Sequence, residues 1–274
     1  MYIKDQGGLS MFIKSNILRS PHAFATRRGG ISEQDHTKSL NLAFGRGDDD
    51  GIVLKNLEIF ANSVGFDAKN VVSMPQIHSD NIFKVGRLDC GKGYFVREDL
   101  SSGDGYITDE KGVVLGIKTA DCVPILFEAE KDGKIVAVGA VHAGWRGTVA
   151  GIAPKCVKML CDNYDVDPEH IKAAIGPCIH KCCYEVGEDL RKEVKNGLGH
   201  SFAERFVVPQ VGMKNKYNCD LVGINRELIL SSGVRSENID ALDLCTCCHP
   251  DLFFSHRFSS GVRGTMLNVI FVQN

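Results

Sequence analysis

Apolar runs without helical periodicity are the feature that most constrains how this chain can fold. Residues 135–143 form one such run, IVAVGAVHA, and residues 112–130 form two more that are separated by a short polar interruption. Runs of β-branched and small apolar residues are typical of strands that are buried on both faces. We therefore expect a central sheet, or two packed sheets, with helices on the outside.

Several other segments have helical or strand patterns. Residues 51–65, 149–164, 184–197 and 219–233 have helical spacing, and the last two end at a glycine, a common helix terminator. Further strands are expected in residues 70–85 with a break at Pro75, 170–179, 238–246, 251–258 and 265–273. This mixture predicts an α/β or α+β protein.

Composition excludes several classes of protein. The 274 residues are 43% hydrophobic with a net charge of −2, which is ordinary for a globular protein and gives no basic surface for nucleic acid. The N-terminal residues do not resemble a signal peptide, and no run approaches the roughly 18 apolar residues of a membrane span. We expect a cytoplasmic protein, with no nucleic-acid or membrane partner, whose 11 cysteines are reduced thiols.

Three potential metal ligands lie where a strand pattern meets a polar break. They are His78 in PQIHSDN, Cys122 in TADCVPILF and His142 in VHAGWRG. Two imidazoles and a thiolate suit zinc, and three protein ligands leave the open fourth position of a catalytic site. The long spacings alone leave other interpretations open: each histidine could be an ordinary hydrogen-bonded residue, and Cys122 could belong to the core.

The motifs of the chain, taken together, resemble a known family. HAFATRRGGIS, SLNLAFGRGDD, PQIHSDNI, GDGYITDEKGVVLGIKTADCVPILF, AVHAGWRGTVAGI, AAIGPCIHKCCYEVG and LCTCCHPDLFFSHR occur in that order. They are similar to the YfiH family, once labelled multicopper polyphenol oxidoreductases or laccase-like proteins. Members are described as purine nucleoside phosphorylases with adenosine deaminase activity. The resemblance runs from about His22 to the C-terminus.

The resemblance carries expectations about fold and site. It implies a single α+β domain over residues 1–274, with a layered mixed β-core flanked by helices and residues 1–20 as a loosely attached N-terminal extension. It also implies that His78, Cys122 and His142 bind zinc. The implied activity is zinc-dependent phosphorolysis of adenosine, inosine and methylthioadenosine, together with deamination of adenosine.

Three further residues are candidates for contacts with substrate or phosphate. Arg146 follows His142 across a glycine-containing turn, and its guanidinium suits phosphate, although it could instead pair with a surface carboxylate. Arg27 precedes paired glycines in a turn that could hold an anion or simply expose solvated arginines. Asn41 could bond a ribose hydroxyl or a base edge, or could stabilise a turn.

Two rival functions come from other classes of protein. A copper-dependent polyphenol oxidase would agree with the old family label, and a thiolate with two imidazoles can bind copper. However, only two of the nine histidines lie in the site motifs, fewer than a multicopper oxidase needs. A metal-free thiol hydrolase would use Cys122 as nucleophile and His142 as base.

The remaining cysteines raise the question of a second metal site. Cys245 and Cys248 form a C-x-x-C motif, and Cys178, Cys182 and Cys183 lie earlier in the chain. Four thiols could bind a structural zinc ion. Because the groups are far apart in sequence and no second C-x-x-C exists, we expect ordinary reduced cysteines here.

Overall fold

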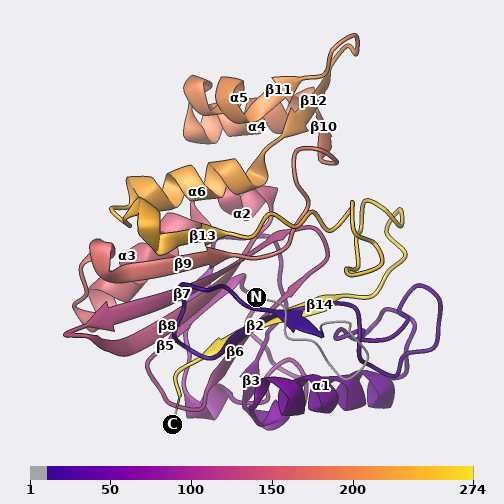
Figure 1. Cartoon of the computed structure of the whole chain (residues 1–274), viewed down its shortest axis with the longest axis vertical. Helices are drawn as coiled ribbons and strands as arrows, with labels where there is room; N and C mark the ends of the chain where they lie inside the picture. The colour runs from indigo at the N-terminus through magenta and orange to yellow at the C-terminus, as the bar shows by residue number, and fades with distance from the viewer. Residues whose placement is uncertain (1–10, 274) are drawn as a thin grey trace.

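Two stacked β-sheets form the centre of the molecule in this computed structural model, which describes residues 11–273 (Figure 1). The first sheet has strand order β1-β2-β14-β6-β3 and the second has order β13-β9-β7-β8-β5-β4. The strands of the first sheet are β1 (Phe12–Ile13), β2 (His22–Ala25), β3 (Val71–Val72), β6 (Val114–Thr119) and β14 (Met266–Phe271). The strands of the second are β4 (Ile82–Lys84), β5 (Gly105–Thr108), β7 (Val123–Lys131), β8 (Lys134–Ala143), β9 (Ile171–Ile175) and β13 (Ile239–Ala241).

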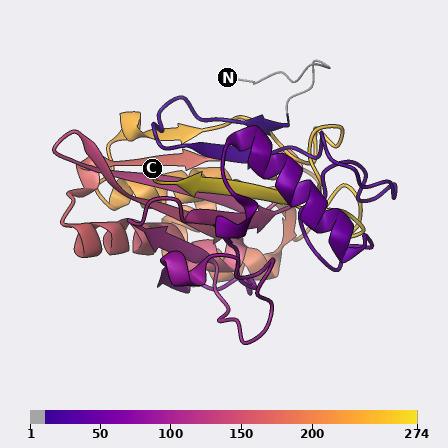
Figure 2. The same ribbon diagram turned by 90° about the horizontal axis from the view of Figure 1, so that it is seen from below.

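Helices cover the outer faces of both sheets (Figure 1). Helix α1 (Asp50–Val64) packs on the five-stranded sheet through Val53, Leu57 and Phe60, and Figure 2 shows it crossing that face. The six-stranded sheet is covered by α2 (Trp145–Val149), α3 (Ile152–Tyr164) and α6 (Leu221–Ser231). Within the described residues, no helix has both the length and the apolar character needed to cross a membrane.

Alternation along β7 shows why its first five residues, 123–127, are all apolar. Ile125 and Phe127 belong to the core beneath the helices, whereas Leu126 belongs to the core between the two sheets. Successive side chains of a strand point to opposite faces, and both faces of this strand are covered. The result is the expected layered mixed β-core flanked by helices.

The hairpin between β7 and β8 fixes the register of the second sheet. Its turn contains Asp132 and Gly133, with φ of 51° and 74°, and Asp-Gly is the preferred sequence where both turn residues need positive φ. The pairing runs from Lys131↔Lys134 to Pro124↔His142 and Val123↔Ala143, with one irregularity at Ala129/Glu130.

A small lobe projects from the helical side (Figure 1, top). It contains a three-stranded sheet of order β10-β12-β11 with two helices. Its elements are β10 (Glu185–Gly187), α4 (Glu188–Leu198), α5 (His200–Phe206), β11 (Val207–Pro209) and β12 (Lys216–Cys219). Short 3-10 helices at Ala68–Asn70, Arg87–Asp89, Pro168–His170 and Ser236–Asn238 complete the regular structure of the described residues.

Most of the predicted elements are present, with several differences. Residues 251–258, expected to form a strand, form turns in which Phe253 and Phe254 are buried, so their apolar character reflects packing of a loop. The segment 184–197 begins as strand β10 before helix α4, and α5 was not predicted. Residues 11–20 are closely attached, because β1 pairs with β2; the rest of the expected N-terminal extension, residues 1–10, lies outside the described residues.

Candidate metal centre and active site

The three predicted ligands meet at one end of the six-stranded sheet. His142 is near the end of β8, and Cys122 immediately precedes β7, so the antiparallel pairing of these strands makes them neighbours. His78 lies in the segment between β3 and β4, close to the start of β4. Cys122 belongs to the connection Ala120–Cys122, through which the chain passes from one sheet to the other.

The geometry of these side chains is that of a metal-ligand set. Their ligand atoms all lie within 4.8 Å of one another. The Sγ atom of Cys122 is 3.9 Å from Nε2 of His78, and the two imidazole rings are 4.8 Å apart at an interplanar angle of 79°. The structure thus brings together the three residues that the sequence singled out.

Asp104, which precedes β5, orients two of the three ligands. Its Oδ1 is 2.8 Å from Nδ1 of His142 and also accepts a hydrogen bond from the backbone N–H of His78 at 3.0 Å. Its Oδ2 accepts bonds from the backbone N–H groups of Ile77 and Ser79 and from the Ser79 hydroxyl. A carboxylate that holds the second nitrogen of a ligating histidine fixes its tautomer and ring orientation.

Two local backbone features give His78 its position. His78 has φ of 61°, a left-handed conformation that costs a non-glycine residue roughly 1–2 kcal/mol and is offset here by the Asp104 contacts. Gly144 lies against the ring: a Cβ there would be 2.9 Å from His78 Cδ2 and 3.4 Å from Cys122 Sγ. Glycine at this position leaves room for the ligands to converge.

Neighbouring charges and hydrogen bonds set the protonation states of Cys122, His142 and Asp104. Burial acts to raise the pKa of Cys122, but His142 and His78 outweigh it and lower the pKa to about 6. Burial acts to lower the pKa of His142, but Cys122 and Asp104 raise it to about 9. For Asp104, hydrogen bonds from His142 and Ser79 outweigh burial and lower the pKa to about 2. Asp104 is therefore ionised at neutral pH, and Cys122 is a thiolate.

Two cavities open onto the ligands. One, of about 260 Å³, has a cationic lining provided by Arg46, Lys118 and Arg263, with Gln76 beside them. Burial, and then the charge of Arg46, lowers the pKa of Lys118 to about 8, so this side chain remains mostly charged at pH 7. The other, of about 340 Å³, is lined by Asp121, Ile179, Tyr184, Leu221, His256 and Arg257, and shares Arg263 with the first.

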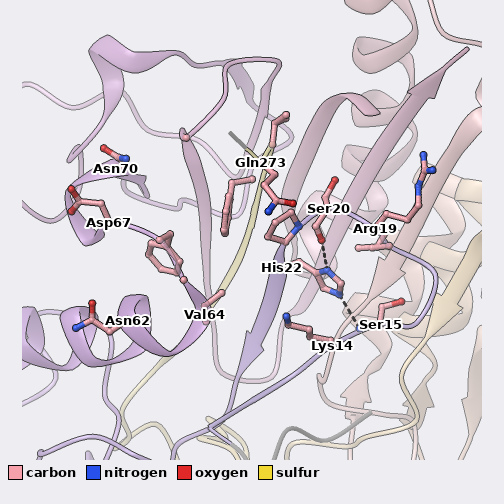
Figure 3. Close-up of a pocket in the computed structure, with 17 residues that line it drawn as sticks. Lys14, Ser15, Arg19, Ser20, His22, Asn62, Val64, Asp67, Asn70 and Gln273 are labelled. Atoms are coloured by element: carbon pink, nitrogen blue, oxygen red, sulfur yellow. Dashed lines mark hydrogen bonds between the residues drawn. The ribbon is translucent and has the colours of Figure 1, made fainter. Parts of the chain in front are cut away.

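A larger cavity of about 820 Å³ lies elsewhere, near the ends of β1, α1 and β14 (Figure 3). Its one histidine, His22, is buried, and both ring nitrogens are already bonded: Nδ1 to the Ser20 carbonyl at 2.7 Å and Nε2 to the Ser15 N–H at 2.9 Å. That imidazole therefore serves to hold the backbone at Ser15 and Ser20.

The other predicted contact residues are not in the lining of either cavity at the ligands. Arg27 bonds the carbonyl of Pro250 and stacks on Phe254 at 4.5 Å. Asn41 is fully buried and bonds Asp48, the Ala43 carbonyl and the Thr265 N–H, which is the turn-stabilising alternative. Arg146 is exposed and lies over its neighbour Trp145 at 4.2 Å.

Sequence reasoning missed the residues that support the site. Asp104 and Lys118 both lie in the stretch GDGYITDEKGVVLGIKTADC, where a charged residue beside buried strands was the available signal. Asp121, the neighbour of Cys122, lies in a bend with φ of 96°. It accepts bonds from the Thr246 hydroxyl and the Arg257 N–H, both at 2.6 Å, and is therefore engaged in holding the loops together.

Comparison with known proteins identifies the family. The family model described as "Multi-copper polyphenol oxidoreductase laccase" matches residues 21–273, almost the whole chain. The chain belongs to this laccase family. The match extends through the segments that carry His78, Cys122 and His142, and it agrees with the resemblance drawn from the motifs.

Several related proteins are similar over most of their length. Purine nucleoside phosphorylase YlmD of Bacillus subtilis is 36% identical over 250 residues, covering 90% of this chain and 86% of the relative. A purine nucleoside phosphorylase of Bacteroides thetaiotaomicron is 32% identical, covering 98% and 97%. Adenosine deaminase RL5, from an unknown prokaryotic organism, is 33% identical, covering 86% and 87%.

Solved structures share the fold. The hypothetical protein YfiH of Bacillus licheniformis superposes with a TM-score of 0.85 at 32% identity, covering 92% of each chain. YlmD of Geobacillus stearothermophilus superposes with a TM-score of 0.84 at 33% identity, covering 96% of this chain and 99% of the other.

The donor set of the laccase-family site fits a zinc ion. Two imidazole nitrogens and a thiolate within 4.8 Å can surround an ion at the usual distances of about 2.0–2.3 Å. His142 would bind through Nε2, because Nδ1 is engaged by Asp104. Three protein ligands would leave a fourth position open, and both cavities are lined by two of the ligands, His78 and Cys122.

Proposed function

We propose that this protein is a zinc-dependent purine nucleoside phosphorylase that acts on adenosine, inosine and methylthioadenosine and also deaminates adenosine. One observation carries the proposal: a His-Cys-His ligand set opens directly onto a cavity lined by Arg46, Lys118 and Arg263. Phosphorolysis requires an anionic co-substrate, phosphate, and the three cationic side chains could hold it beside the ligand set. The names of the relatives, purine nucleoside phosphorylase and adenosine deaminase, support the substrate class.

The cationic cavity has the charge needed to hold phosphate. In phosphorolysis, a phosphate oxygen forms a bond to C1′ of the ribose while the bond from C1′ to the purine nitrogen breaks. The purine leaves and takes up a proton, and the sugar passes through a cationic state. Guanidinium and ammonium groups can bind phosphate and hold it in line with that bond.

The second cavity suits the nucleoside. It combines apolar contacts from Ile179 and Leu221 with the aromatic ring of Tyr184, a surface on which a purine can pack. Because both cavities are lined by His78 and Cys122, phosphate and nucleoside would meet at the ligand set.

Zinc held there would supply Lewis-acid chemistry, polarising a substrate oxygen or a water molecule. The contribution of the chain itself is to keep the ligands in place through Asp104. Deamination replaces the purine amino group with oxygen from water and releases ammonia. It therefore needs the ligand set but not the phosphate cavity.

A metal-free thiol hydrolase is the second candidate, and a specific arrangement favours it. Cys122, His142 and Asp104 form a thiolate, an imidazolium and an orienting carboxylate, the order expected of a nucleophile, its base and a third group. The third ligand, His78, has no role in that mechanism. Copper would also suit the donor set, as the family's description implies.

A nucleoside panel tests the proposal. Purified protein is incubated with adenosine, inosine and methylthioadenosine, with and without inorganic phosphate, and the products are identified. Free purine base together with ribose 1-phosphate, formed only when phosphate is present, is the expected result. Release of the purine base at a rate that does not depend on phosphate would indicate hydrolysis and would contradict the proposal. Oxidation of phenols without cleavage of nucleosides would also contradict it.

A further inference from the structure

A second group of potential ligands lies outside the candidate active site. The Sγ atoms of Cys182, Cys183, Cys245 and Cys248 all lie within 4.8 Å of one another. Cys248 is central to the group, with its sulfur 3.5 Å from that of Cys182 and 3.4 Å from that of Cys183. These cysteines are free thiols, as the sequence analysis expected, but the structure brings four of them together although they are far apart in the sequence.

Backbone pairing brings the two cysteine loops together. Cys178 and Cys245 form an isolated parallel bridge, in which Thr246 N–H donates to the Cys178 carbonyl at 2.9 Å and Cys178 N–H donates to the Leu244 carbonyl at 3.3 Å. The loop of Cys182 and Cys183 is closed by bonds from Cys183 and Tyr184 to the His180 carbonyl. The fold itself thus presents four thiols to one point.

The sulfur spacing matches that of a tetrathiolate metal site. Four sulfurs about 2.3 Å from a zinc ion form a tetrahedron with edges of about 3.8 Å. The two sulfur separations at Cys248 are slightly shorter than this edge, and the others do not exceed 4.8 Å. Four thiolates this close would repel one another strongly, and a divalent cation between them removes that repulsion.

A backbone donor adds to the match. The N–H of His180 points at Sγ of buried Cys245 at 3.5 Å, the kind of contact that stabilises a thiolate. We propose that Cys182, Cys183, Cys245 and Cys248 bind a structural zinc ion. Four protein ligands close the coordination shell, so this site has no open position for substrate, unlike the first.

Contacts around the second site indicate what the ion would hold. Arg257 donates to the carbonyls of Cys183 and Glu185, at 3.0 Å and 2.9 Å, and its own N–H donates to Asp121, the neighbour of Cys122. Glu185 is the first residue of β10 in the small lobe. The zinc would therefore fasten the base of this lobe, and the loop containing Arg257, to the wall of the second cavity.

The inference is tested by measuring the zinc content of protein variants in which the first metal site has been disabled. Cys122→Ala removes a ligand of the first site, and we expect this protein, purified without chelator, to retain about one zinc per chain. Adding Cys248→Ser should remove most of that zinc, because the most central ligand is lost. Adding Cys161→Ser instead, at a partly exposed cysteine of α3 outside both groups, should leave zinc content unchanged. Equal zinc in the two double variants would overturn the proposal.

X-ray absorption at the zinc edge gives a test that needs no change in the cysteine group. In Cys122→Ala, the remaining zinc should have four sulfur neighbours at about 2.3 Å. A shell of nitrogen and oxygen, or iron in place of zinc, would contradict the proposal. So would a disulfide that joins Cys248 to Cys182 or Cys183 in the purified protein, detected by mass spectrometry after alkylation without reductant.

Discussion

Oδ1 of Asp104 lies 2.8 Å from Nδ1 of His142 and also accepts the backbone N–H of His78. One carboxylate oxygen thus orients one metal ligand through its ring and a second through its backbone. The side chain of Asp104 is fully buried, so its charge is compensated by these bonds rather than by water.

Asp104→Asn should weaken zinc binding at the first site. The amide keeps the shape of the side chain but removes the charge that favours the correct tautomer of His142, and loss of such a partner typically costs about 10- to 100-fold in metal affinity. Zinc affinity is measured by competition with a chelator. Asp109→Asn is the matched control, because Asp109 lies at the other end of β5, is half-exposed and contacts Lys84 and Tyr164 rather than the ligands. Equal affinities in the two variants would show that Asp104 does not support the ligands.

Lys118 should make phosphate use depend on pH. Burial and the charge of Arg46 lower its pKa to about 8, so its positive charge is present below pH 8 and is lost as the pH rises through 8. The KM for phosphate should therefore rise above pH 8. Lys118→Arg keeps its charge and should move this break to higher pH, whereas Lys118→Met should raise the KM roughly 10- to 150-fold at pH 7, the cost of a lost charged hydrogen bond. An unaltered pH profile in Lys118→Arg would exclude Lys118 from phosphate binding.

Gly144→Ala tests how tightly the ligands are packed. The new Cβ would be 2.9 Å from the His78 ring, so the ring or the turn must move by a few tenths of an ångström. Displacements on this scale are costly in active sites, and we expect turnover to fall about tenfold or more while the melting temperature changes little. Gly51→Ala is the control, since a Cβ at Gly51, in α1, meets nothing within 4 Å. Wild-type turnover in Gly144→Ala would mean that the ligands tolerate this displacement.

Arg146 and Arg263 separate two assignments of the phosphate contact. The sequence suggested Arg146, which is exposed and stacked on Trp145, whereas Arg263 lines both cavities at the ligands. We expect Arg263→Met to reduce phosphate-dependent cleavage at least tenfold and Arg146→Met to change it less than about twofold. Steady-state rates at varied phosphate concentration distinguish them. The reverse order of effects would restore Arg146 to the site and remove Arg263.

Part of this site could be predicted from local sequence. The Asp-Gly turn at residues 132–133 sets the register of the β7–β8 hairpin, and that register makes Cys122 and His142 neighbours. The positions of His78, shortly before β4, and of Asp104, immediately before β5, depend instead on the parallel pairing of these two strands, which a long connection separates in the sequence. No local pattern specifies such pairing, so the sequence offered His78 as a candidate by its residue type and its place at a polar break, the resemblance implied that it joins the other two ligands, and Asp104 was missed.

The features that local sequence patterns left open or misassigned have a common physical cause. Asn41, Phe253 and Phe254 lie in loops that are as buried as the strands, so apolar or amide residues there serve packing and turn bonds. Likewise, the four cysteines of the second group come from two loops that are far apart in the sequence and are joined by the Cys178–Cys245 bridge and by the His180 N–H bond to Cys245. Long-range contacts of this kind leave no periodic signal in the sequence.

The dependence of phosphorolysis on the first site is tested most directly by metal depletion and restoration. Protein stripped of metal by a chelator is assayed for adenine release from adenosine in the presence of phosphate, before and after zinc is added back, alongside Cys122→Ala treated identically. We predict that the stripped protein is inactive, that zinc restores phosphate-dependent release of adenine and ribose 1-phosphate, and that Cys122→Ala stays inactive throughout. Full activity in the metal-free protein would contradict the account and favour a thiol nucleophile at Cys122.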